Sequence, residues 1–185
     1  MDRIITYADK LILYPIIGGH MVSVYFVSNI FGKIISLLII PINNVMLSYI
    51  AKLDKKSNKL FSDTLFFTGT ISVIGYLGCL FVSEPMLKIL YPQYAIEAMQ
   101  YIKITSLSGI LQILVSSLSP FLLKFYGKDW QVKINSITLA CYFLISIITY
   151  LEFGFRGFCV GVVITNIIKI VIMISVFYFK NDKVD

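Results

Sequence analysis

The sequence has little charge, and that charge is unevenly spread. Only 14% of its 185 residues are Asp, Glu, Lys or Arg, and 58% are hydrophobic. Residues 34–51, 64–83, 104–123 and 134–151 contain no charged residue at all. A surface helix of a soluble protein carries a polar stripe, whereas a helix that crosses a bilayer core needs about 20 mostly apolar residues. The composition therefore predicts an all-α, polytopic transmembrane helix bundle.

The sequence also has few of the residue types that catalysis requires. His20 is the single histidine, and no cluster of His, Asp and Glu, no Ser–His pair and no Gly-rich phosphate loop occurs. The three cysteines, Cys79, Cys141 and Cys159, fall in apolar spans without the spacing of a metal site, which is typical of packing residues. We therefore expect no enzymatic activity, no catalytic residue, no metal site and no cofactor.

Apolar runs and the breaks between them predict about six helical segments in a single domain over residues 1–185. The expected helices cover residues 3–17, 22–51, 60–82, 98–123, 132–151 and 157–179. The third should stop at Ser83-Glu84-Pro85, and the amphipathic stretch 86–96 should lie at the membrane interface.

The first expected helix is short. From Ile4 to Ile17 it would span only about 21 Å, against an apolar core of about 30 Å. It also carries Asp9 and Lys10. Two interpretations stay open: an interfacial helix, or the second half of a spanning helix whose first half is missing.

Basic residues alternate between the loops. The loops after the second and fourth helices and the C-terminal tail hold most of them: Lys52, Lys55, Lys56, Lys59, Lys124, Lys128, Lys133, Lys180 and Lys183. The opposite loops hold only Lys88 and Arg156. By the positive-inside rule both termini are cytoplasmic, provided that the first segment crosses the membrane. Because the basic residues do not gather on one polar segment, nucleic-acid binding is not expected.

Charged and polar residues within the spans are the candidate site residues, because charge inside a bilayer is costly and by default marks function or a buried pair. The candidates are Lys10, Lys33, Lys169, Asn29, Asn166 and Gln112. The lysines could bind phosphate as point charges, or they could pair with a nearby acid or extend to the interface. The amides could bind sugar hydroxyls, or they could form hydrogen bonds between helices, as could Asn43.

Glycines in the third expected helix predict close helix packing. Gly69, Gly75 and Gly78 lie six and three residues apart. Small residues at such spacings let two helix backbones approach each other. We therefore expect the helix at 60–82 to pack tightly against a neighbour.

Five short motifs occur in an order that resembles a known transporter family. They are the Ala-Asp-Lys-Leu-Ile-Leu stretch at 8–13, Gly18-Gly19 with Val24-Tyr25, Pro41 with the run 46–53, Leu-Tyr-Pro-Gln-Tyr at 90–94 with Ala95 and Ala98, and Gly-Phe-Arg-Gly at 154–157. Together they cover nearly the whole chain. The set resembles the C-terminal lobe of the polysaccharide (O-antigen type) flippases, whose superfamily includes multidrug antiporters and lipid II flippases.

This resemblance implies half of a two-lobe transporter fold in a bacterial cytoplasmic membrane. The family moves polyprenyl-pyrophosphate-linked glycans, the precursors of lipopolysaccharide or capsule, by alternating access between two lobes. The chain would then be a truncated or split member that needs a second lobe, from another chain or from a homodimer. The candidate residues would line the cavity between the lobes.

Two alternatives stay open. One is a non-transporting remnant or an accessory membrane bundle of a glycan assembly complex. The other is a multidrug antiporter-like lobe, which would need acidic residues within the spans, whereas those here are mostly lysines.

Overall fold

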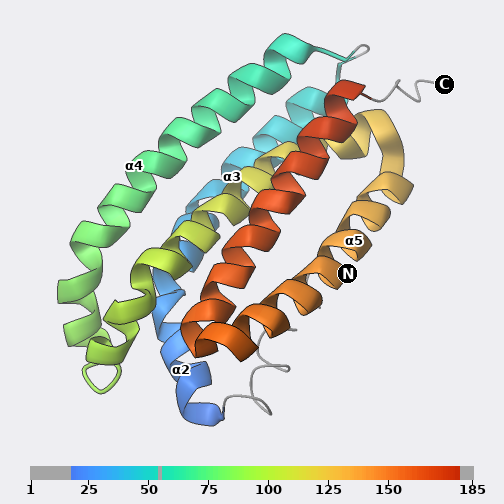
Figure 1. Ribbon diagram of the computed structural model, residues 1–185. Coiled ribbons are helices and arrows are strands. Elements are labelled where there is room, and N and C mark those ends of the chain that lie inside the picture. Colours follow the sequence, from blue (N-terminus) through green and yellow to red (C-terminus); the bar gives the residue numbers. More distant parts are fainter. Residues whose placement is uncertain (1–17, 54–55, 180–185) are drawn as a thin grey trace.

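The chain is all-helical over residues 18–53 and 56–179, the part that the computed structural model describes (Figure 1). Four elements follow one another: α2 (Gly19–Ser28), α3 (Ile30–Ala51), α4 (Asn58–Leu90) and α5 (Ala95–Phe179). The expected helix at 3–17 lies outside the described residues, as do the side chains at 38–40 and 42. The all-α class predicted from the sequence is confirmed over the described ranges.

Two glycines divide α5 into three helical segments. Gly127 (φ 79°, ψ 176°) and Gly154 (φ 61°, ψ −148°) both have positive φ, which only glycine adopts at little cost. Figure 1 shows the chain reversing at each glycine, so that residues 95–126, 128–153 and 155–179 run antiparallel in succession. We call these the first, second and third segments of α5. They overlap the last three helices expected from the sequence, with turns of one residue in place of loops.

The single helix expected at 22–51 is two helices in the structure. The axes of α2 and of the first part of α3, Ile30–Leu37, differ by 44° at the break between them. The Ser28 hydroxyl and the Asn29 amide both donate to the carbonyl of Tyr25, at 3.0 and 3.2 Å. Side chains that bond back to the preceding turn compete with the backbone ladder and bend helices. Polar residues at 28 and 29 therefore explain why this long apolar run is not straight.

α4 is longer than the sequence predicts. It begins after Ser57, whose hydroxyl accepts from the backbone N–H of Leu60 (3.2 Å) as an N-cap. The predicted stop at Ser83-Glu84-Pro85 is wrong, because the helix continues to Leu90. Leu87 is fully buried, and Lys88 Nζ lies 2.7 Å from Glu84 Oε1 one turn earlier. These contacts support the last turn despite the proline.

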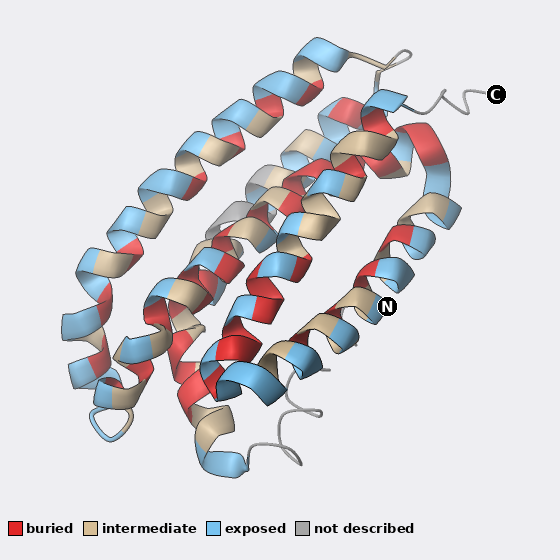
Figure 2. Cartoon of the chain, viewed as in Figure 1, coloured by how far each residue is buried: buried red, intermediate tan, exposed pale blue. Residues whose placement is uncertain are grey.

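Among residues 18–53 and 56–179, two helical elements are long and apolar enough to cross a membrane. These are α4 and α5, and the bent pair Gly19–Ser28 and Ile30–Leu37 would add a third. Their outward faces carry large apolar side chains: Phe66 is 77% and Phe81 is 82% exposed. Figure 2 shows exposed residues along the outer side of α4 for its whole length. Soluble monomers rarely expose contiguous apolar surface of this extent. The structure is thus compatible with a membrane protein, whereas the count of six spans stays a prediction.

The two ends of the bundle differ in charge. At one end Lys56 Nζ donates to the Tyr126 hydroxyl and Lys124 Nζ to the carbonyl of Ala51, both at 2.9 Å. The end of α3, the start of α4 and the Gly127 turn therefore lie together. We call this the lysine-rich end, and it gathers Lys52, Lys56, Lys59, Lys124, Lys128 and Lys133. The loops predicted to be basic thus meet at one end of the fold.

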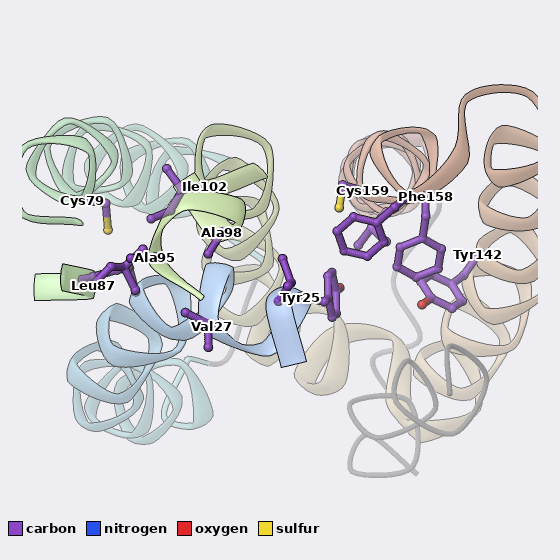
Figure 3. Close-up of a cluster of buried hydrophobic side chains, with 14 residues drawn as sticks. Tyr25, Val27, Cys79, Leu87, Ala95, Ala98, Ile102, Tyr142, Phe158 and Cys159 are labelled. Atoms are coloured by element: carbon purple, nitrogen blue, oxygen red, sulfur yellow. The ribbon is translucent and has the colours of Figure 1, made fainter. Parts of the chain in front are cut away.

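Aromatic side chains lock the helices together at both ends. At the lysine-rich end Phe61 of α4 stacks on Phe177 of α5, with ring centres 3.7 Å apart and both side chains fully buried. At the opposite end Tyr25 packs edge-on against Phe158 at 5.6 Å, and Tyr142 lies on the far side of that ring (Figure 3). Because lipid tails are as apolar as these rings, close packing holds helices together in a bilayer.

Candidate functional site

Lys33 lies just after the bend between α2 and α3. Its backbone N–H donates to the carbonyl of Asn29 (3.2 Å), so it stands one helical turn beyond the bend. The side chain is exposed, and Nζ lies 4.6 Å from the centre of the Phe26 ring. A cation over an aromatic face is attracted by the ring quadrupole. This contact joins α2 to α3 across the bend and holds the ammonium group near it.

Asn29 itself acts on its own helix. Its side chain is half-buried, and Nδ2 donates to the Tyr25 carbonyl. This bond explains the residue structurally as part of the bend. A contact of Asn29 with a ligand stays a prediction.

The first segment of α5 is central in the bundle and bonds to its neighbours through hydroxyl groups. Thr105 Oγ1 donates to the carbonyl of Ser28 in α2 (2.9 Å). The Asn43 amide of α3 donates to Ser116 Oγ (2.9 Å), and Ser117 Oγ donates to Asn43 Oδ1 (3.1 Å). The amide of Asn43 is therefore satisfied at both ends by α5. These contacts are the interhelical hydrogen bonds that the sequence left open as an alternative.

Asn166 ties the third segment of α5 to the first. Its Nδ2 donates to Ser108 Oγ (3.0 Å) and to the Ser108 carbonyl (3.4 Å). The side chain is half-buried between the two segments. Asn166 therefore has a structural partner, and any ligand contact would be made in addition to it.

Two glycines bring α3 and the first segment of α5 into backbone contact. A Cβ placed on Gly109 would lie 2.7 Å from Gly32 Cα, closer than side chains tolerate. A Cβ on Gly32 would lie 3.0 Å from Gly109 Cα. The helices can cross at this point only because both residues lack side chains. The crossing fixes Lys33, the neighbour of Gly32, at the depth of Gly109.

Gln112 and Lys169 lie at nearly the same depth in the bundle. Gln112 follows Ser108 by one turn and is exposed. Lys169 follows Asn166, the hydrogen-bond partner of Ser108, by almost one turn and is half-buried. The first and third segments run in the same direction (Figure 1), so offsets of four and three residues from the Ser108–Asn166 bond place the two residues at nearly the same depth. Gln112 also follows Gly109 by less than a turn. Four predicted site residues, Lys33, Gln112, Asn166 and Lys169, therefore occupy adjacent turns of three neighbouring helices.

The candidate Lys10 and a set of hydrogen-bonding residues that the sequence did not predict remain to be placed. Lys10 lies outside the described residues. The seam formed by Thr105, Ser108, Ser116 and Ser117 was not predicted from the sequence, although Ser and Thr are dense between positions 105 and 119 of a charge-free span. Hydroxyl groups in such a span have no water to bond, so they form hydrogen bonds with neighbouring helices. The density of Ser and Thr in this span was the feature of the sequence that could have predicted the seam.

Within residues 18–53 and 56–179, the His, Cys, Asp and Glu side chains form no group that could hold a metal ion. His20 Nδ1 instead lies 3.6 Å from Glu97 Oε2 at the end opposite the lysines.

A scan of protein-family models, a search of curated proteins and a search of solved structures find no match for this chain.

Proposed function

We propose that this chain is one lobe of a transporter that moves a polyprenyl-pyrophosphate-linked glycan across a bacterial cytoplasmic membrane. The observation that carries the proposal is that Lys33, Gln112 and Lys169 lie on adjacent turns of neighbouring apolar helices, with Lys33 just after the bend between α2 and α3. Broken or bent helices near the bilayer centre are frequent at transporter substrate sites. Ionisable groups at such depth mark substrate pathways by default.

In this mechanism the two lysines act as phosphate-binding point charges. An ammonium group offers three donors on a flexible stem and suits a pyrophosphate that must bind and then leave. The exposed amide of Gln112 would reach the sugar next to the phosphate. Alternating access would come from rocking this lobe against a second lobe, supplied by another chain or by a second copy.

The sign of the charge separates this proposal from a multidrug antiporter-like lobe. Antiporters of cationic drugs need acids at this depth to hold the cation and the proton. Among the described residues of the site the charged groups are Lys33 and Lys169, both cationic. An anionic substrate is the better match.

A second candidate function is a non-transporting accessory bundle of a glycan assembly complex. It is favoured by the internal use of polar groups: Asn43 and Asn166 both bond to the first segment of α5. Such bonds, at about 1 kcal/mol each, stabilise a fixed bundle as well as they would a moving one.

Complementation separates the two functions. The chain is expressed in a bacterial strain that lacks its own flippase, once alone and once with the first lobe of a working flippase, and membrane insertion is verified in the same cells. We expect surface polysaccharide to return in at least one arrangement. Absence of polysaccharide in both, despite insertion, contradicts transport and supports the accessory bundle.

Lysine variants test the proposed site in the arrangement that works. Lys33→Ala and Lys169→Ala each remove a charge-assisted contact of about 1.5–3 kcal/mol, so we expect export to fall by about 10- to 100-fold. Lys128→Ala, an exposed lysine at the lysine-rich end, is the matched control and should export normally. Normal export by both site variants would exclude the cationic site.

A further inference from the structure

A groove between α3 and α4 lies outside the site already described. Its volume is about 630 Å³, within the usual range of ligand pockets. Val45 and Tyr49 of α3 form one wall and Phe66 and Phe67 of α4 the other, with Phe121 of α5 at its base. The wall residues are largely exposed, Val45 at 71% and Phe67 at 61%. The groove is therefore an apolar recess that opens to the surroundings of the bundle.

The groove ends at the lysine-rich end. Ile50, near the end of α3, and Leu60, in the first turn of α4, both line it. Lys52 follows the end of α3, Lys59 lies in the first turn of α4, and both are exposed. Lys56 differs from them, because its Nζ donates to the Tyr126 hydroxyl and lies 4.8 Å from the Phe177 ring. Lys52 and Lys59 thus flank this end of the groove, which we call its mouth. Lys56 is instead held against Tyr126 and Phe177.

Asp63 is the charged residue among those that line the groove, and it limits where an anion can sit. It lies one turn further along α4 than Lys59 and is exposed. An anionic group would be repelled at that depth and attracted at the mouth. Charge thus separates the groove into a cationic rim and an apolar interior, the same division that a phospholipid has between its phosphate and its acyl chain.

We propose that this groove binds one anionic phospholipid of the leaflet at the lysine-rich end, with an acyl chain between α3 and α4 and its phosphate against Lys52 and Lys59. Clusters of four or more basic residues next to a membrane helix favour anionic lipids, at about 1 kcal/mol per residue. The segment 52–59 has four lysines and one acid, Asp54, in eight positions, so that its net charge is +3. Each buried methylene of the chain adds to this attraction. The proposal does not depend on transport, because an accessory bundle would bind the lipid equally.

Photolabelling in vesicles tests the site. The purified full chain is reconstituted in phosphatidylcholine vesicles that contain a small fraction of phosphatidylglycerol with a diazirine midway along one acyl chain. We expect adducts in residues 45–50 and 60–67, and stronger labelling than with the same diazirine on phosphatidylcholine. Adducts spread evenly over all helices, or equal labelling by the two lipids, would overturn the proposal.

Charge variants test the role of the rim. Lys52→Gln with Lys59→Gln should lower the preference for phosphatidylglycerol by about 30-fold, the equivalent of two lysines. Lys128→Gln with Lys133→Gln removes the same charge at the same end, on the second segment of α5 and on the far side of the bundle from α4 (Figure 1), and should leave the preference intact. An equal loss in both double variants would mean a diffuse surface charge and no site.

A filled groove tests the interior. Val45→Trp adds bulk at an exposed position without opening the core, so labelling by both lipids should fall several-fold while the thermal midpoint stays within a few degrees of wild type. Unchanged labelling would overturn the placement of the acyl chain. Disulfide formation between copies in the double variant Tyr49→Cys with Phe67→Cys, in place of lipid adducts, would make the groove an interface between copies and would also overturn it.

Discussion

The crossing of Gly32 and Gly109 gives the sharpest test of the fold. In Gly109→Ala the new Cβ would lie 2.7 Å from Gly32 Cα, so the two helices must separate. Overpacking of this kind costs about 1–3 kcal/mol. Alanine also favours a helix over glycine by about 1 kcal/mol. The net effect on the free energy of unfolding should therefore be a loss of about 0–2 kcal/mol.

Gly69→Ala is the control that isolates the contact. Gly69 lies within α4, and a Cβ there would have no neighbour within 4 Å. The same helix-propensity gain applies without the clash, so this variant should be as stable as wild type or up to about 1 kcal/mol more stable. The difference between the two variants, about 1–3 kcal/mol, measures the crossing itself.

The assay is reversible unfolding of the purified chain in mixed micelles, by titration with dodecyl sulfate and circular dichroism. Gly109→Ala should unfold at a clearly lower mole fraction of dodecyl sulfate than Gly69→Ala. Equal midpoints for the two variants would refute the backbone contact, and with it the depth assigned to Lys33.

Three further predictions follow from the hydrogen bonds. Asn43→Leu removes the donor to Ser116 and the acceptor of Ser117, and it should lower the free energy of unfolding by about 2 kcal/mol in the same titration; no loss would contradict the interhelical bonds. Tyr126→Phe removes the 2.9 Å bond to the Phe177 carbonyl and also the acceptor of Lys56, and it should cost about 1–2 kcal/mol, with thermal unfolding as the measurement and an unchanged midpoint as the contrary result. Asn29→Leu should reduce the 44° bend, seen as a longer distance between spin labels placed on α2 and α3, and an unaltered distance would show that the bend has another cause.

Local composition predicts the helices well. Charge-free runs identify the apolar segments of α3, α4 and α5, because a long run without charge has few other stable structures. Gly154 falls in the break expected between the helices at 132–151 and 157–179, and the structure has a turn there with the positive φ that glycine tolerates. Pro85 misled the prediction, because the buried contact of Leu87 outweighs a local helix-breaking tendency.

Contacts between helices are harder to predict. The glycine spacing favoured a tight contact along α4, yet Gly69 and Gly78 have no neighbour near a Cβ. The tight approaches are at Gly32 with Gly109, at Gly157 with Thr149 and at Gly161 with Ser146. Spacing within one helix shows that a face is small, but it does not show which partner meets that face. The polar seam on α5 was missed for the same reason.

The single-residue turns at Gly127 and Gly154 restrict how the segments of α5 can move. A helix end joined to the next through one residue stays within about 7 Å of it, closer than the usual 8–10 Å between packed helix axes. The second segment therefore stays next to the first at the lysine-rich end, through Gly127, and next to the third at the opposite end, through Gly154. Any rearrangement of these three segments must therefore change the angles between them, while the two helix ends that meet at each glycine stay together.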